Sequence, residues 1–153
     1  MATTSRNVHT AVIDWDGTAV PGGQWPDKPT TFMPGFVKAM RRLHKEGLRL
    51  VIMSSRLNPH DPYTGEQTEH YRAMAAGNYQ YMRSMLDAQG LTFVAVWFRE
   101  GKPSGFAYVD DRAERYSGRK NAWDAMADRL LLRAGKEDAV FPAYEMEAEW
   151  QAT

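Results

Sequence analysis

The stretch AVIDWDGTAV, Ala11 to Val20, decides the fold of this chain of 153 residues. The run from Val8 to Asp14 is apolar and β-branched, which is typical of a buried strand, and Gly17 breaks the chain soon after it. Two carboxylates, Asp14 and Asp16, stand one residue apart where this strand ends. An Asp-Gly pair after a strand is most often an ordinary turn, so the meaning of the two carboxylates depends on what the rest of the chain places beside them.

The composition excludes several classes of protein. Lysines plus arginines number 19, as do aspartates plus glutamates, so a formal net charge of zero gives no general attraction to nucleic acid or to a membrane surface. The chain has no cysteine, which excludes disulfides, thiolate metal sites and cysteine nucleophiles. The polar N-terminus has no signal-peptide pattern, and no apolar run approaches the roughly 18 residues of a membrane helix. We therefore expect a cytoplasmic protein that does not enter a membrane.

Strand and helix patterns alternate along the chain. The hydrophobic periodicity predicts strands at about 8–14, 48–53, 91–98 and 106–109, a short fifth strand at 139–141, and helices at about 34–46, 66–89 and 120–134. This order predicts an α/β fold, a three-layer α/β/α Rossmann-like sandwich with a mainly parallel sheet. We expect a single domain over residues 1–153, with its core at about 8–141 and a tail at 142–153.

Polar side chains follow each of the first four predicted strands. After the four strands come, in order, Asp14, Asp16, Gly17 and Thr18; Ser54, Ser55 and Arg56; Lys102; and Asp110, Asp111 and Arg112. In open parallel sheets the working groups lie at the carboxyl ends of the strands, so we expect these side chains to gather at one edge.

The chemistry of this set is coherent. Clustered carboxylates repel one another unless a cation lies between them, and an all-oxygen site suits Mg²⁺. A lysine and a hydroxyl suit the oxygens of a phosphoryl group. One carboxylate can attack phosphorus, and a second can protonate the leaving oxygen and later activate water. The residues therefore predict a metal-dependent site for phosphoryl transfer.

The order DxDGT, strand–Ser, Lys and DD resembles the haloacid dehalogenase (HAD) superfamily of phosphohydrolases. The segment KPSGFAYVDDRA is similar to a stretch of the small, capless members of that superfamily. The resemblance covers about Val8 to Ala113. It implies a HAD-like core without a cap domain, because Ala19 to Met33 is long enough only for a flap and Leu57 to Gln89 reads as a loop and one helix.

The resemblance assigns roles to the first and third motifs. It implies that Asp14 is the nucleophile and a Mg²⁺ ligand, and that Asp16 is the general acid/base, with its backbone carbonyl as a further metal ligand. An Asp at position 16 favours a phosphatase over the dehalogenases and P-type ATPases of the superfamily. Gly17 permits the close turn, Thr18 holds the loop beside the substrate, and Lys102 offsets the charge on nucleophile and phosphate.

Two assignments within the remaining motifs stay open. Ser54 matches the hydroxyl that binds the phosphoryl group, and Ser55 is its rival because the strand end can slip by one residue. Asp110 matches the carboxylate ligand of Mg²⁺, and Asp111 supports it directly or through water. Arg56 either contacts the substrate or is a solvated salt-bridge partner.

The substrate is expected to be a phosphate monoester: a small ester, a nucleotide or a nucleic-acid end. Arg112, Arg115, Arg119 and Lys120, with Tyr116 among them, suit nucleotide contact, although a solvated loop also explains them. The oligomeric state is open, as is whether the tail or a partner subunit closes the site. The alternative is a receiver-like or catalytically silent phosphate-binding module. In receivers the acidic pair comes first and the phosphorylated Asp ends a later strand. Here the DxDGT motif, with the expected nucleophile Asp14, comes first and the Asp110–Asp111 pair comes last.

Overall fold

The computed structural model describes residues 9–22, 27–99, 101–112 and 118–134 of the chain. Contacts between residues divide the chain into two compact units, Met1–Asp61 with Gly65–Asp111, and Pro62–Thr64 with Arg112–Thr153. The first unit holds the sheet and two α-helices, and the second holds helix α3, Ala122–Ala134. The strand predicted at 139–141 and the tail at 142–153 lie outside the described residues.

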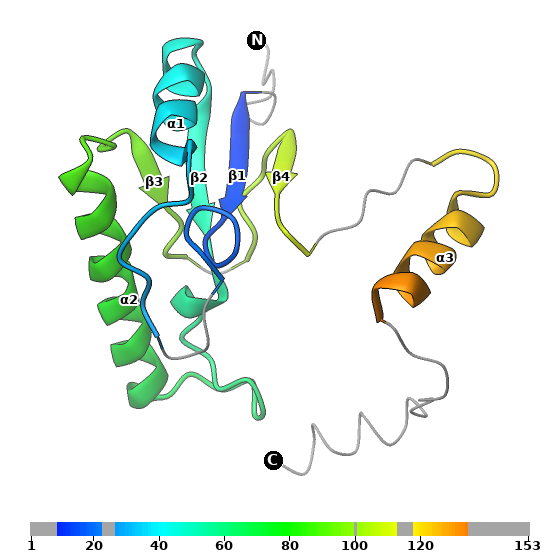
Figure 1. Ribbon diagram of the computed structural model, residues 1–153. Coiled ribbons are helices and arrows are strands. Elements are labelled where there is room, and N and C mark those ends of the chain that lie inside the picture. Colours follow the sequence, from blue (N-terminus) through cyan, green and yellow to red (C-terminus); the bar gives the residue numbers. More distant parts are fainter. Residues whose placement is uncertain (1–8, 23–26, 100, 113–117, 135–153) are drawn as a thin grey trace, which may run out of the picture. The chain divides into compact units, whose positions relative to one another are not determined.

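A four-stranded, all-parallel sheet forms the centre of the first unit (Figure 1). Its strands are β1 (Thr10–Asp14), β2 (Arg49–Met53), β3 (Val94–Val96) and β4 (Ala107–Val109). They lie in the order β3-β2-β1-β4, and the register pairs Asp14 with Met53 on one side of β1 and Ile13 with Val109 on the other. Because all four strands run the same way, their carboxyl ends meet at one edge.

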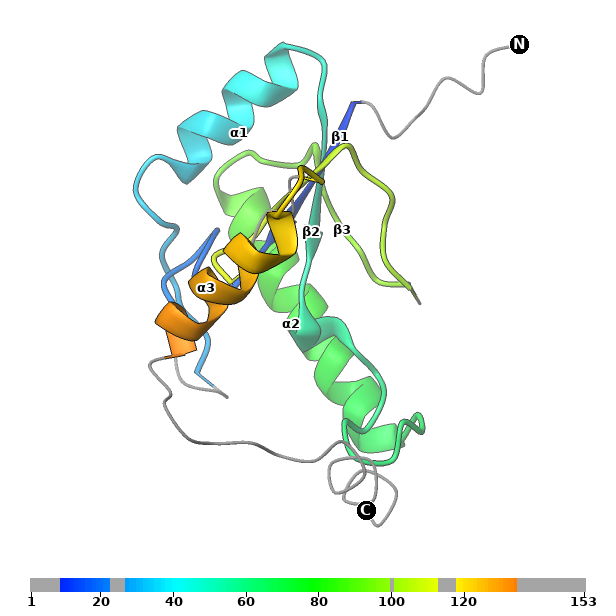
Figure 2. The same ribbon diagram turned by 90° about the vertical axis from the view of Figure 1, so that its right-hand side faces the viewer.

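Helices α1 (Phe36–Lys45) and α2 (Glu69–Ala88) cover the same face of this sheet (Figure 2). Right-handed crossovers from β1 to β2 and from β2 to β3 require this placement, because both steps move in the same direction across the sheet. Thr68 fixes the start of α2, since its side-chain Oγ1 accepts a hydrogen bond from the Tyr71 backbone N–H at 3.2 Å. That cap explains why α2 begins three residues after the predicted position 66.

The core lies between the sheet and these two helices. Alternate strand residues, among them Ile13, Leu50 and Ile52, pack against Met40 of α1 and Met82 of α2. Trp15, which stands between the two carboxylates in the sequence, is fully buried and meets the rings of Phe32 and Tyr81 edge-on at 5.8 and 5.7 Å. The burial of Trp15 anchors the loop that carries Asp14 and Asp16.

The connection from β3 to β4 returns across the sheet so that β4 pairs with the far side of β1. A side chain at Gly105 would place its Cβ 2.7 Å from the Thr10 carbonyl oxygen, so only glycine allows the connection to approach β1 this closely. The next residue, Phe106, donates its backbone N–H to that same carbonyl at 2.9 Å.

The predicted α/β class and parallel sheet are confirmed, with four strands described. The third strand is shorter than the predicted 91–98. In their described residues, the segments 15–35 and 54–68 contain no helix or strand other than the 3₁₀-helix η1 (Ser55–Leu57). Among the described residues, no helix has both the length and the apolar character needed to cross a membrane.

Candidate functional site

The sheet has one topological switch point, between β1 and β4. The chain steps from β1 to β2 to β3 in one direction and then returns to place β4 on the opposite side of β1. In open parallel sheets ligands bind in the crevice outside the carboxyl ends of the strands at such a point. Asp14 ends β1, and Asp110 and Asp111 follow β4 directly, so all three carboxylates belong to this position.

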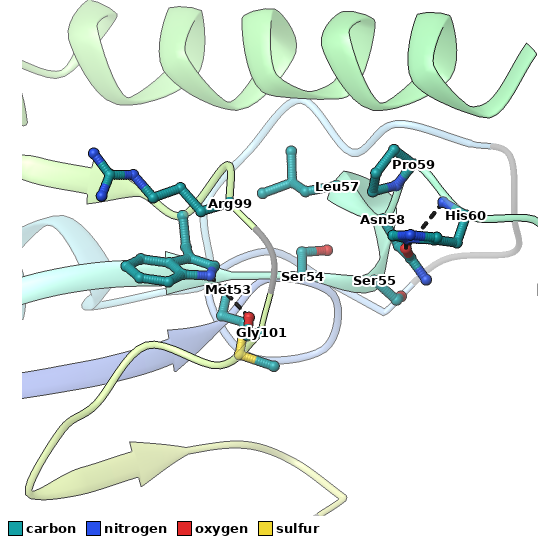
Figure 3. A pocket seen from close by; sticks show the side chains of 10 residues that line it. Met53, Ser54, Ser55, Leu57, Asn58, Pro59, His60, Arg99 and Gly101 are labelled. Atoms are coloured by element: carbon teal, nitrogen blue, oxygen red, sulfur yellow. Dashed lines mark hydrogen bonds between the residues drawn. The ribbon is translucent and has the colours of Figure 1, made fainter. Parts of the chain in front are cut away.

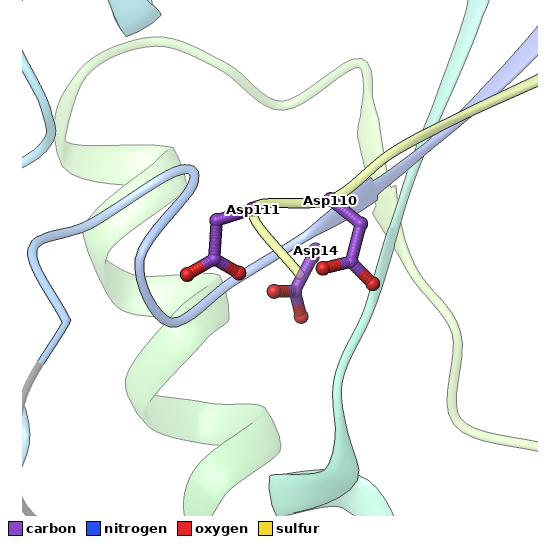
Figure 4. A group of neighbouring side chains, drawn as sticks. All are labelled: Asp14, Asp110 and Asp111. Carbon is purple, nitrogen blue, oxygen red and sulfur yellow. The ribbon is translucent and has the colours of Figure 1, made fainter. Parts of the chain in front are cut away.

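The carboxylates of Asp14, Asp110 and Asp111 form an acidic cluster, in which each side chain offers an oxygen within 4.8 Å of the others. Figure 4 shows the three side chains side by side with their carboxylates directed the same way. Asp14 is half-buried, and the other two are exposed. An all-oxygen set of this kind is suited to a hard divalent cation and can hold a metal ion.

The environment of Asp14 disfavours its charge. Burial is the main cause that raises the pKa of this carboxyl, from 3.8 to about 6, and the charges of Asp110, Asp111 and Asp16 add to it. A hydrogen bond from the backbone N–H of Trp15 works in the opposite direction. A cation at the acidic cluster would offset the repulsion between Asp14 and the neighbouring carboxylates and would favour the charged form of Asp14.

The raised pKa of Asp14 predicts a pH-dependent stability of the metal-free protein. The folded state holds this proton more tightly than the unfolded state, so the contribution of Asp14 to stability is fully present below pH 3.8 and is lost as pH rises through about 6. Urea unfolding in a chelating buffer between pH 4 and 7 measures this loss. The difference between the wild type and Asp14→Asn isolates it, and identical pH profiles for the two proteins would contradict the assignment.

The loop after β1 lies against Asp111. Gly17 has φ +78, and a Cβ there would stand 2.3 Å from Oδ2 of Asp111. The Thr18 Oγ1 is buried and has no hydrogen-bond partner among the described residues, so the predicted role of Thr18 in holding the loop is not seen. Gly17 is therefore needed both for its left-handed backbone conformation and for the space that the Asp111 carboxylate occupies.

Gly17→Ala is expected to weaken Mg²⁺ binding about tenfold or more, because the new methyl group displaces the Asp111 carboxylate. The left-handed conformation adds a loss of stability of about 1–2 kcal/mol. Gly65→Ala is the matched control, since Gly65 has φ +73 and open space around its Cβ position. Calorimetric titration with Mg²⁺ separates the two effects: equal affinities in both variants would show that Asp111 does not hold the ion.

Asp16 is held by Arg56 instead of joining the acidic cluster. The guanidinium donates from Nε to Asp16 Oδ2 at 2.7 Å and from Nη2 to Oδ1 at 2.9 Å, and it also donates to the carbonyl of Asp27 in the flap. The Arg56 side chain is only 2% exposed and that of Asp16 is 32% exposed. The sequence left Arg56 open between a substrate contact and a solvated salt-bridge partner; it is a salt-bridge partner of Asp16, but a buried one. Its planar guanidinium donates to both carboxylate oxygens of Asp16 at once.

The two candidate serines differ in their surroundings. Ser54 caps η1, with its Oγ accepting from the backbone N–H of Arg56 at 3.2 Å. This contact uses the hydroxyl as an acceptor and leaves its proton for a phosphoryl oxygen. Ser55 is the first residue of η1 and is exposed. Both serines line the same cleft.

Lys102 lies over the ring of Tyr108 in β4. Its ammonium stands 5.5 Å from the centre of the Tyr108 ring, and within the described part of the chain it forms no ion pair with Asp14, Asp110 or Asp111. The Tyr108 hydroxyl donates to the carbonyl of Pro103, which fixes this part of the connection beside β4. The role that the resemblance implies for Lys102, offsetting the charge on nucleophile and phosphate, stays a prediction.

Other residues near the strand ends were not singled out by the sequence analysis. Trp97 and Arg99 follow β3 and line a cleft that Ser54 also lines. Trp97 falls inside the predicted strand 91–98, and it follows the strand only because β3 ends at Val96. Of the predicted basic cluster, residues 113–117 lie outside the described residues, and the remainder belongs to the second unit.

Comparisons with known proteins leave the activity to be argued from this geometry. No protein-family model and no curated protein matches the sequence. Among solved structures, a conserved protein from Bacteroides thetaiotaomicron is similar, with a TM-score of 0.43 and 21% sequence identity over 86% of this chain and 94% of that chain. Proteins that share a general architecture need not share an activity.

Proposed function

We propose that this protein is a magnesium-dependent phosphatase that hydrolyses a phosphate monoester through an aspartyl-phosphate on Asp14. The observation that carries the proposal is the meeting of Asp14 with Asp110 and Asp111 at the switch point of a parallel sheet. The resemblance of the DxDGT and YVDDRA segments to HAD phosphohydrolases supports the same chemistry.

The acidic cluster supplies the expected metal ligands. Carboxylate oxygens of Asp14, Asp110 and Asp111 would hold Mg²⁺ there. A bound Mg²⁺ would offset the negative charge of the phosphoryl group and of the cluster. The residues fit this ion because the donor set is entirely oxygen and the cluster contains no cationic side chain.

The chain's own residues perform the two chemical steps. A carboxylate oxygen of Asp14 attacks phosphorus, the bond from phosphorus to the ester oxygen breaks, and the leaving oxygen takes a proton from Asp16. Water then attacks the phosphorus, Asp16 accepts its proton, and phosphate leaves with Asp14 restored. The Ser54 hydroxyl donates to a phosphoryl oxygen and orients the group for attack.

The resting contact of Asp16 bears on its role as an acid. Both of its carboxylate oxygens accept hydrogen bonds from Arg56, so Asp16 must give up part of this pairing when it carries a proton to the leaving group. Catalytic hydrogen bonds often reach their working geometry only in the substrate complex. Arg56 is thus a positioning residue, which acts through Asp16.

The test is phosphate release from a panel of monoesters, with and without Mg²⁺. The panel contains an aryl phosphate, sugar phosphates, 5′- and 3′-mononucleotides and phosphorylated oligonucleotides. Release that requires both Mg²⁺ and Asp14 supports the proposal. A receiver-like module would instead accumulate phosphorylated Asp from acetyl phosphate without rapid release, and a silent module would bind phosphate esters without turning them over.

A further inference from the structure

A cleft of about 470 Å³ opens beside the phosphate-binding serine, at the carboxyl ends of β2 and β3. Its lining includes Ser54, Asn58, His60, Trp97 and Arg99. In Figure 3, Ser54 lies between Arg99 and the pair formed by Asn58 and His60. The volume falls in the range of about 300–1,000 Å³ typical of small-molecule sites.

One residue that lines the cleft is the sheet partner of Asp14. Asp14 pairs in register with Met53, and Met53 also lines the cleft. The Trp97 backbone N–H donates to the Ile52 carbonyl at 2.8 Å, which places Trp97 level with the end of β2. Asp110 and Asp111 lie on the opposite side of β1, after β4. The cleft on the β2 and β3 side therefore offers space for the ester substituent of a phosphoryl group held near Ser54.

The lining combines a fixed aromatic ring with polar groups. The indole Nε1 of Trp97 donates to the Gly101 carbonyl at 2.9 Å, which holds the ring in one orientation. Asn58 Oδ1 accepts from the His60 backbone N–H at 3.0 Å and lies 3.0 Å from His60 Nδ1, so the polar wall is also ordered. Arg99 is exposed and forms no ion pair with any described residue.

Building on the proposed phosphatase activity, we propose that this cleft binds the leaving group of the substrate and that the leaving group is a nucleoside. The Trp97 ring stacks on the base, because every base presents a flat π face and stacking tolerates different bases. The polar wall of Asn58 and His60 faces the hydrogen-bonding edge of the base. Arg99 contacts a second negative charge, such as a further phosphate on the sugar.

The test compares adenosine 5′-monophosphate with ribose 5-phosphate. Both release phosphate from the same kind of primary oxygen, so their ratio of kcat/KM reports the base alone. We expect the wild type to prefer the nucleotide about tenfold or more. Trp97→Leu should reduce that ratio to about one, whereas Trp97→Phe, which keeps a ring, should retain a preference of several-fold.

Phe98→Leu is the matched control for the tryptophan. Phe98 is the neighbouring aromatic residue and is 46% exposed, its ring centre lies 5.3 Å from that of Tyr79 in α2, and it lines an adjoining pocket instead of this cleft. The Phe98→Leu variant should leave the kcat/KM ratio of the two substrates unchanged. Arg99→Gln should lower kcat/KM for adenosine 3′,5′-bisphosphate about two- to fivefold at low salt, and Arg42→Gln on α1 should not.

The possible outcomes test the assignment of the cleft and the proposed phosphatase activity separately. The assignment of the cleft is overturned if the wild type releases phosphate from both compounds with a kcat/KM ratio near one. It is also overturned if Trp97→Leu lowers kcat/KM equally for both compounds. Either result leaves the proposed phosphatase activity intact. No release from any substrate overturns the phosphatase. Calorimetric binding of the same two compounds to the wild type and Trp97→Leu then decides the cleft by itself. A 5′-phosphorylated oligonucleotide in the same assays shows whether the nucleoside belongs to a free nucleotide or to a nucleic-acid end.

Discussion

Asp14→Asn is expected to lower Mg²⁺-dependent phosphate release by at least about a thousandfold. The amide keeps the shape of the side chain but has no anionic oxygen to attack phosphorus. Asp14 is also one of the three carboxylates of the acidic cluster, so the variant should bind Mg²⁺ more weakly. Phosphate release measured at saturating Mg²⁺ distinguishes the lost nucleophile from weaker metal binding.

The same substitution should stabilise the metal-free fold at neutral pH. It removes a charge whose pKa is raised mainly by burial and further by the neighbouring carboxylates. Asp87→Asn provides the control, because Asp87 lies near the end of α2, where it pairs with Arg83. That variant should keep its activity. If Asp14→Asn retains more than a tenth of the wild-type rate, Asp14 is not the nucleophile.

Asp16→Asn is expected to reduce the free energy of unfolding by about 3–5 kcal/mol. The Arg56 guanidinium is 2% exposed and would remain in the interior without its carboxylate partner. Urea unfolding with circular dichroism measures the loss. An unchanged free energy of unfolding would mean that the Asp16–Arg56 pair does not persist in solution.

The reverse substitution should cost less. Arg56→Met fills much of the same space and leaves Asp16, which is 32% exposed and can recover contact with water. We expect a loss of about 1–2 kcal/mol. The double variant should be more stable than the sum of the two single losses implies, because the second substitution removes the stranded charge. Strict additivity would show that the two side chains do not interact.

This pairing links the stability of the fold to the proposed acid/base group. Arg56 joins Asp16 to the flap through the Asp27 carbonyl, and the backbone carbonyl of Arg56 accepts from Asn78 of α2 at 2.9 Å. Arg56→Lys keeps the charge but cannot make both hydrogen bonds to Asp16 in the same planar geometry. Activity measurements on any variant of this pair therefore need a folded fraction measured at the same temperature.

The sequence by itself determined the parallel α/β sheet and the meeting of the acidic residues. Asp14 and the Asp110–Asp111 pair each follow an apolar strand, and parallel strands bring their carboxyl ends to one edge whatever the side chains do. The strand order places β4 beside β1, and these carboxylates are therefore neighbours. The pattern of strands was sufficient to predict this cluster because the three aspartates stand directly at the strand ends.

Only the tertiary structure decided which long side chains reach that edge. Asp16 and Arg56 are separated by 40 residues, and they pair because the flap and η1 bury the arginine where a carboxylate is the available partner. Lys102 stands at Tyr108 because its loop is fastened beside β4. The Trp97 cleft is formed where the segments that follow β2 and β3 meet. Each outcome depends on burial and on side-chain reach of several ångströms, quantities that residue order and periodicity do not specify.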